Sequence, residues 1–166
     1  MLGGTRSGKS RYAEDLLPPG EPVRYVATAR RRADDAEWDA RIDAHRARRP
    51  AGWATVEESD IAALVRGGGG PLLVDDLATW LTGVLDDAGA WEQRVDVSPR
   101  LDELVAAVRT APGQVVLVSA EVGLGVVPAT RSGRLFRDEL GALNAALAQV
   151  CDEVVLLVAG LPVRLK

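Results

Sequence analysis

Residues 3–10, Gly-Gly-Thr-Arg-Ser-Gly-Lys-Ser (GGTRSGKS), decide how the rest of this sequence is interpreted. The stretch fits G-x-x-x-x-G-K-[ST] without a mismatch, which is the pattern of a loop that binds nucleotide phosphates. Its glycines allow the backbone to turn and to direct N–H groups at phosphate oxygens. The helix expected to begin near Lys9 directs its positive end at the same place. We therefore predict a phosphate-binding loop made of Gly3, Gly4, Thr5, Arg6, Ser7, Gly8, Lys9 and Ser10.

Two residues of this loop have separate roles in the prediction. Of the 20 Lys and Arg residues in the chain, only Lys9 and Lys166 are lysines, so a lysine inside the loop needs its own explanation. A compact ammonium fits between the β- and γ-phosphates of an enclosed site better than a wide, planar guanidinium does. The hydroxyl of Ser10 is expected to bind Mg²⁺. The alternative is a chance match in a chain that contains 17 glycines.

The strand that should present the loop is nearly absent from the sequence. Only Met1 and Leu2 precede the first glycine, whereas a loop of this kind normally follows a buried strand. Two residues are not expected to form a buried central strand. Because the remaining sequence has the pattern of a complete domain, we expect that the first strand is truncated and that the true start lies upstream.

Downstream of the loop, apolar strands alternate with helices. Strands are predicted at 23–28, 71–75, 114–119 and 153–160, with a short one at 163–166. Helices are predicted at 9–17, 34–48, 61–66, 77–85, 98–110 and 133–150. Ser98 is the expected N-cap of the fifth helix, because Pro99 follows it. Strands that are apolar throughout are buried on both faces, so the pattern predicts an α/β fold with three layers, a mostly parallel sheet and a single domain over 1–166.

The apolar strand PLLVD ends in a pair of carboxylates, Asp75 and Asp76. In a parallel sheet the end of such a strand lies beside the phosphate-binding loop, so one carboxylate is expected to bind Mg²⁺ directly or through water. We assign this role to Asp75. In the alternative interpretation, the pair only begins the next helix, as an N-cap and a first-turn charge.

The single histidine lies on a predicted helix that is rich in arginine. Arg41 precedes His45 by four residues, and Arg48 and Arg49 follow it within about a turn. Neighbouring positive charge disfavours the imidazolium, so the ring is expected to remain neutral and nucleophilic at pH 7. Attack on the phosphorus of a nucleotide would then form a covalent His–N–P intermediate. From spacing alone, a sole histidine on a charged helix is more often a surface or packing residue, and this alternative stays open.

Composition limits the classes of function that fit the chain. The formal net charge is −4, with 20 basic and 24 acidic residues, which argues against bulk nucleic-acid binding. No apolar run reaches the length of a membrane span, so stable membrane insertion is not expected. Cys151 is the only cysteine and cannot form an internal disulfide. A soluble protein of the reducing cytoplasm is therefore expected.

Four segments, taken in order along nearly the whole chain, resemble the bifunctional adenosylcobinamide kinase/adenosylcobinamide-phosphate guanylyltransferase family of cobalamin biosynthesis. They are GGTRSGKS (3–10), YVATAR (25–30), RIDAHRARRPAGWATVE (41–57) and EVGLGVVPATRSGRLFRDELGALN (121–144). The first motif alone is moderately specific, and the third and fourth together are highly specific.

The resemblance implies a P-loop NTPase fold of the RecA-like type and two reactions. A nucleoside triphosphate, ATP or GTP, phosphorylates the hydroxyl of the aminopropanol arm of adenosylcobinamide. GTP then guanylylates a histidine, here His45, and the phosphate of adenosylcobinamide phosphate takes the GMP to form adenosylcobinamide-GDP. The family also implies a homo-oligomer, with a trimer as the expectation. Its nucleotide contacts correspond to residues 3–10, Ala27, Thr28, Ala29, Arg46, Arg48, Arg49, Glu57 and Asp75, with Ser10 and Asp75 on Mg²⁺.

The sequence departs from the family pattern at positions that concern the kinase reaction. Ala120 stands where the family often has Asn, and Ala29 where Ser is common. The carboxylate after the apolar strand is Asp75, one methylene shorter than the usual Glu. Two alternatives therefore remain: a simple P-loop small-molecule kinase with a structural His45, and a non-enzymatic GTP-binding module.

Overall fold

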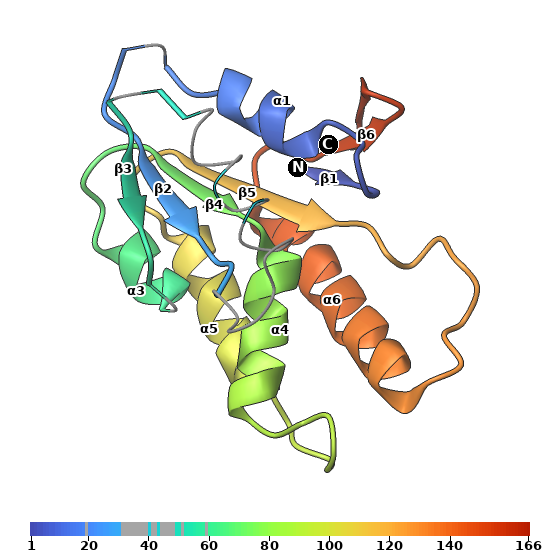
Figure 1. Ribbon diagram of the computed structural model, residues 1–166. Helices are drawn as coiled ribbons and strands as arrows, with labels where there is room; N and C mark the ends of the chain where they lie inside the picture. The colour runs from blue at the N-terminus through green and yellow to red at the C-terminus, as the bar shows by residue number, and fades with distance from the viewer. Residues whose placement is uncertain (19, 31–39, 41–42, 44–48, 51, 59) are drawn as a thin grey trace.

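The computed structural model describes residues 1–18, 20–30, 40, 43, 49–50, 52–58 and 60–166. Its strands are β1 (Leu2–Gly3), β2 (Arg24–Ala27), β3 (Ala54–Val56), β4 (Leu72–Asp75), β5 (Val115–Ala120), β6 (Val155–Val158) and β7 (Leu161–Arg164). They form one seven-stranded sheet in the order β3-β2-β4-β5-β1-β6-β7. Every pairing is parallel except that of β6 with β7 (Figure 1).

The helices of the described residues cover both faces of this sheet. They are α1 (Lys9–Asp15), α3 (Ile61–Arg66), α4 (Leu77–Asp87), α5 (Ser98–Arg109) and α6 (Arg131–Val150). Helix α1 lies on one face, and α3 to α6 lie on the other (Figure 1). The predicted three-layer, mostly parallel α/β fold is confirmed.

The alternation of side chains along β4 explains why the central strands are apolar throughout. Leu72 and Val74 belong to the larger core under α3 to α6, whereas Leu73 belongs to the smaller core under α1. Successive residues of a strand point to opposite faces of the sheet, so a strand covered on both sides needs apolar residues at every position. By the same alternation, Asp75 follows Leu73 on the α1 face.

The expectation that two residues could not form a central strand is wrong. Leu2 and Gly3 pair in parallel with Ser119 and Ala120 on one side, and with β6 on the other. The carbonyl of Gly3 also accepts a hydrogen bond of 3.1 Å from the N–H of Glu121. Strand β1 is short, at two residues. Pairing on both edges gives its backbone groups partners, and this is enough to hold the phosphate-binding loop at the end of a strand that lies between β5 and β6.

The predicted elements differ from the observed ones at several of their ends, such as the start of α6 at Arg131 in place of 133, and in the respects that follow. Strand β3 pairs with β2 and was not predicted. Ser98 is the first residue of α5 and not its cap; Val97 occupies the N-cap position, and the carboxylate of Asp96 accepts the N–H of Ser98. The short strand predicted at 163–166 is β7, which begins two residues earlier at Leu161. The helix predicted at 34–48 lies largely outside the described residues. In the part of the chain that the structure describes, no helix is long and apolar enough to cross a membrane.

Candidate nucleotide and metal site

The phosphate-binding loop connects β1 directly to α1. Gly8 adopts a φ of 89° and Arg6 a φ of 57°, so the chain makes its turn in left-handed backbone conformations, of which the first suits glycine. A Cβ on Gly3 would lie 2.4 Å from Oγ of Ser7 and 3.0 Å from the carbonyl oxygen of Leu157. Glycine is therefore required at position 3 for the loop to fold against β6.

Two hydrogen bonds within the loop meet at the carbonyl of Gly4. The carbonyl of Gly4 accepts hydrogen bonds from the N–H of Ser7, at 3.3 Å, and from Nζ of Lys9, at 3.5 Å. Oγ of Ser7 is buried and has no hydrogen-bond partner in the structure. The Lys9 ammonium thus lies beside the loop backbone, and its predicted contact with the β- and γ-phosphates stays a prediction.

The sequence left two roles open for the pair Asp75–Asp76, a carboxylate at the nucleotide site and an N-cap of the next helix, and each residue has the contacts of one of them. Oδ1 of Asp75 accepts a 3.1 Å hydrogen bond from Oγ of Ser10, so this carboxylate lies against the phosphate-binding loop. Asp76 is the N-cap of α4, and its carboxylate accepts the N–H of Thr79 at 2.7 Å. One carboxylate therefore lies at the site and the next begins a helix, which combines both interpretations.

The fit of this site to Mg²⁺ follows from its donor set. Ser10 offers a hydroxyl and Asp75 a carboxylate, 3.1 Å apart, and Mg²⁺ is typically bound by one or two such protein oxygens together with phosphate oxygens and water. No group of three or more His, Cys, Asp or Glu side chains gathers elsewhere among the described residues to form a metal centre. The two residues present therefore suit a metal that arrives with a nucleotide.

Tyr25 is a site residue that the sequence did not predict. Its hydroxyl donates a 2.6 Å hydrogen bond to Oδ2 of Asp75, and its side chain is 2% exposed. Burial, together with the neighbouring carboxylate, raises the pKa of this hydroxyl far above its ordinary value, so it remains a donor at neutral pH. The signal in the sequence was a side chain with a polar atom between Arg24 and the apolar residues of β2.

Two residues enclose the Tyr25 ring. The guanidinium of Arg49 lies 3.6 Å from the ring centroid, and its NH1 group donates to Oγ1 of Thr55 at 2.8 Å. The ring of Trp53 lies 6.3 Å from that of Tyr25, centroid to centroid, and packs against the smaller core. The described contacts of Arg49 are thus made within the protein, and its predicted contact with a nucleotide stays a prediction.

The other predicted nucleotide contacts lie at the carboxyl ends of β2 and β3. Oγ1 of Thr28 donates to the carbonyl of Asp76 at 2.8 Å and accepts its N–H at 3.0 Å, so this hydroxyl holds the connection between β4 and α4. Ala27 ends β2, Ala29 follows, and exposed Glu57 follows β3. Because β2, β3 and β4 are parallel, these residues share one edge of the sheet with Asp75.

His45, Arg46 and Arg48 lie outside the described residues. Their predicted roles rest on the sequence alone, and the structure gives no distance between the imidazole of His45 and the phosphate-binding loop. The nearest described residue downstream is Arg49.

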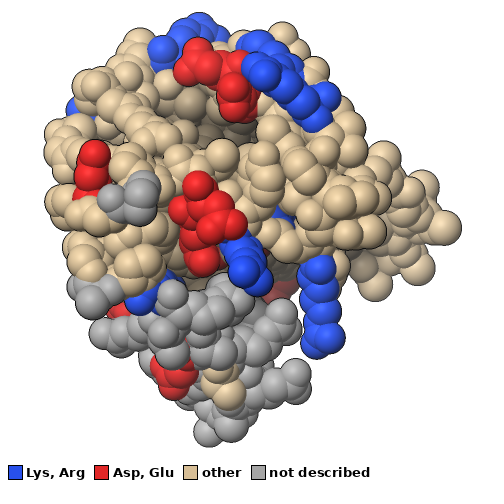
Figure 2. All heavy atoms as spheres, turned by 90° about the horizontal axis from the view of Figure 1, so that it is seen from above, with Lys and Arg blue, Asp and Glu red and all other residues tan. Residues whose placement is uncertain are grey.

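The segment after β5 makes contacts within itself and with the loop that follows α4. Arg131 donates to the carbonyls of Ala90, Trp91 and Gln93, and Arg134 donates to those of Pro128 and Ala129. The carboxylate of Glu121 accepts the N–H of Gly123. Glu121 and Arg134 therefore hold their own segment in place, whereas Arg131 fastens the start of α6 to the loop after α4. On the α1 side of the molecule, acidic and basic side chains lie interspersed (Figure 2).

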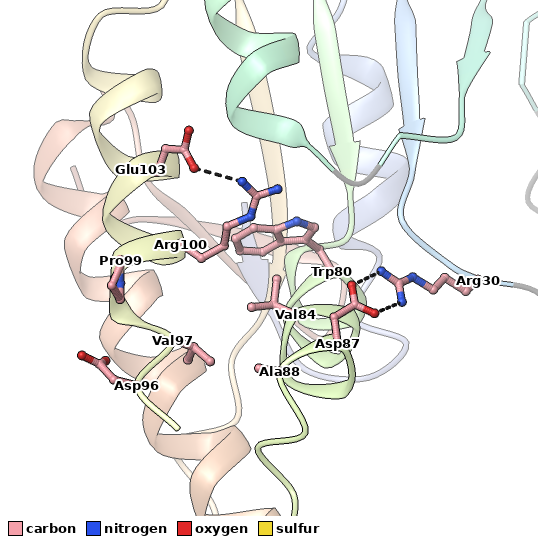
Figure 3. Close-up of a pocket in the computed structure, with 10 residues that line it drawn as sticks. All are labelled: Arg30, Trp80, Val84, Asp87, Ala88, Asp96, Val97, Pro99, Arg100 and Glu103. Carbon is pink, nitrogen blue, oxygen red and sulfur yellow. Dashed lines mark hydrogen bonds and ion pairs between the residues drawn. The ribbon is translucent and has the colours of Figure 1, made fainter. Parts of the chain in front are cut away.

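A cavity of about 460 Å³ lies away from the phosphate-binding loop, between α4 and α5 (Figure 3). Trp80 and Val84 of α4 line it, and Asp87 forms a bidentate ion pair of 2.7 Å with Arg30 beside it. Trp80 belongs to the larger core, so the cavity lies on the sheet face opposite to α1. None of the predicted site residues that the structure describes lines this cavity.

Comparison with known proteins covers the whole chain. A family model described as cobinamide kinase / cobinamide phosphate guanyltransferase matches residues 1–165. The bifunctional adenosylcobalamin biosynthesis protein CobP of Pseudomonas aeruginosa is 47% identical over 173 residues, which cover 100% of this chain and 95% of that protein. The bifunctional adenosylcobalamin biosynthesis proteins CobU of Escherichia coli and Salmonella typhimurium are 38% and 37% identical, over 100% of this chain and 98% of each protein.

Proposed function

This chain belongs to the cobinamide kinase / cobinamide phosphate guanyltransferase family and is a bifunctional enzyme of cobalamin biosynthesis, and we propose that one nucleotide site built on residues 3–10 serves both of its reactions. The observation that supports this proposal most directly is the 3.1 Å contact between Ser10 and Asp75. It joins the loop to the only carboxylate that the sequence assigned to a metal.

In the kinase reaction, the hydroxyl of the aminopropanol arm of adenosylcobinamide attacks the γ-phosphorus of a nucleoside triphosphate. A new O–P bond forms, the bond from the γ-phosphorus to the β–γ bridging oxygen breaks, the nucleoside diphosphate leaves, and the hydroxyl proton passes to solvent. Lys9 neutralises charge on the β- and γ-phosphates, and the backbone N–H groups of the loop hold the phosphate tail in line for the attack.

In the guanylyl transfer, a ring nitrogen of His45 attacks the α-phosphorus of GTP. An N–P bond forms and pyrophosphate leaves from the loop. A phosphate oxygen of adenosylcobinamide phosphate then attacks the same phosphorus, the N–P bond breaks, and adenosylcobinamide-GDP is released. The covalent intermediate divides one transfer between two anionic reactants into two steps.

Mg²⁺ is the proposed metal, held by Ser10 and Asp75 together with phosphate oxygens. When bound, it neutralises charge that develops on the leaving phosphates. Ser10 and Asp75 would hold the metal beside the phosphate-binding loop, and Tyr25 holds the carboxylate of Asp75 from the other side.

The test of this proposal is the covalent intermediate. Protein incubated with α-labelled GTP is expected to carry label that acid removes and base does not, as for a phosphorus–nitrogen bond to histidine. Label should leave the protein when adenosylcobinamide phosphate is added, and appear in adenosylcobinamide-GDP. Kinase activity with no label on the protein would instead support a simple P-loop kinase in which His45 is structural.

A homo-oligomer, with a trimer as the expected form, and a cytoplasmic location complete the proposal. Support for self-association comes from β7 and its neighbours, where Val158, Leu161, Val163 and Leu165 are 53%, 69%, 46% and 56% exposed. Apolar side chains grouped on an edge strand favour burial against another chain. Light scattering is expected to give about three times the chain mass of 17.6 kDa, and a monomer mass would contradict the proposal.

A further inference from the structure

We infer that Tyr25 is a positioning residue for the metal-binding carboxylate: its hydroxyl holds Oδ2 of Asp75 so that Oδ1 faces Ser10 and the phosphate-binding loop. This inference rests on the proposed function, because it takes Asp75 and Ser10 as the groups that bind Mg²⁺.

The register of the sheet explains how Tyr25 reaches Asp75. Tyr25 pairs with Leu73 of β4, two residues before Asp75, so all three side chains lie on the α1 face of the sheet. A tyrosine is long enough to extend along this face to the end of the neighbouring strand. The hydrogen bond that results is 2.6 Å long, which is typical of a hydroxyl that donates to a carboxylate.

The two oxygens of Asp75 therefore have different surroundings. Oδ2 receives the Tyr25 hydroxyl in the interior, at 2.6 Å, and Oδ1 receives Ser10 at 3.1 Å. A carboxylate bonded at both oxygens cannot rotate about its terminal torsion without breaking one of these bonds. Groups that hold a metal ligand in this way commonly set the affinity of the metal.

The tyrosine itself is fixed by its packing. It is 2% exposed, lies in the core under α1, and carries the Arg49 guanidinium 3.6 Å from its ring centroid. Arg49 is in turn bonded to Thr55 of β3. The hydroxyl of Tyr25 thus has a defined position before any nucleotide binds, as preorganisation of a ligand requires.

The test measures metal affinity without turnover. Mn²⁺ is titrated into the full chain saturated with a non-hydrolysable GTP analogue, and free Mn²⁺ is followed by electron paramagnetic resonance. Tyr25→Phe keeps the ring that packs against Trp53 and Arg49 but removes the hydroxyl, and it is expected to weaken Mn²⁺ binding about tenfold. Tyr12→Phe removes the hydroxyl of the only other tyrosine and is expected to leave the affinity unchanged. A Tyr25→Phe affinity within twofold of the unsubstituted protein overturns the inference.

Asp75→Asn separates this inference from the proposed function. We expect it to weaken Mn²⁺ binding at least as much as Tyr25→Phe, and the double variant to be little worse than Asp75→Asn alone, because the hydroxyl acts through the carboxylate. Additive losses would overturn the positioning role while leaving Asp75 as a ligand. If Asp75→Asn binds Mn²⁺ normally, the metal assignment itself fails, and the inference fails with it.

A second measurement needs no variant at Tyr25. Protein labelled with ¹³C at Cζ of tyrosine contains two such carbons, those of Tyr12 and Tyr25. Titration of the nucleotide-bound protein with Mg²⁺ is expected to shift the Tyr25 signal along the same curve as metal binding and to leave the Tyr12 signal in place. A Tyr25 signal that does not move at saturating Mg²⁺ overturns the inference.

Discussion

Lys9→Ala is expected to slow both the kinase reaction and the guanylyl transfer by about 10²-fold or more. Both reactions place the phosphate tail of a nucleotide in one loop, and the ammonium of Lys9 lies over that loop, 3.5 Å from the carbonyl of Gly4. Its loss removes a positive charge from the position where negative charge develops in the leaving group. The measurement is kcat/KM for each reaction, with adenosylcobinamide and its phosphate as the separate acceptors.

Two variants control for charge and for folding. Arg11→Ala removes an exposed positive charge from the same helix, two residues after Lys9, and is expected to leave both rates unchanged. Lys9→Arg keeps the charge but is expected to be slow as well, because the planar guanidinium does not fit an enclosed loop. Equal rates for Lys9→Ala and the unsubstituted protein in either reaction would show that this reaction does not use the loop.

The features of this site that could be predicted are those that depend on neighbours in sequence. The phosphate-binding loop is specified by spacing within eight residues, and its left-handed turn at Gly8 is a local property of the backbone. Asp75 could be predicted because a buried parallel strand ends at it, and strand ends meet at one edge of the sheet. The predictions of the loop and of Asp75 needed only the knowledge of which segments are strands and which are helices.

The role of Tyr25 could not be predicted, because it depends on register. Nothing in the sequence states that Tyr25 pairs with Leu73, and a shift of one residue would direct its hydroxyl to the other face of the sheet. Likewise, β3 has three residues, which are too few to show the alternation of apolar and polar residues that predicts a strand. Residues 2 and 3 were predicted to be too few to form a central strand. They do form β1, because they pair with β5 on one edge and with β6 on the other. In each case a contact between distant segments decides the outcome.

His45→Ala is expected to abolish guanylyl transfer and to leave the kinase reaction measurable. The covalent step needs a nitrogen nucleophile, and His45 is the only histidine in the chain, so no neighbouring imidazole can replace it. The kinase reaction transfers the γ-phosphoryl group directly to a hydroxyl and makes no use of that nitrogen. The measurement pairs acid-labile label from α-labelled GTP with the rate of adenosylcobinamide phosphate formation in the same preparation.

The pattern across variants distinguishes a nucleophile from a structural residue. His45→Ala should lose the label completely and keep the kinase rate, whereas Lys9→Ala should reduce both, because the loop is shared and the imidazole is not. His45→Asn, which keeps a polar side chain but offers no nucleophilic nitrogen, is expected to behave like His45→Ala. Equal loss of both reactions in either histidine variant would make His45 an architectural residue, and retention of acid-labile label would place the covalent bond on another side chain.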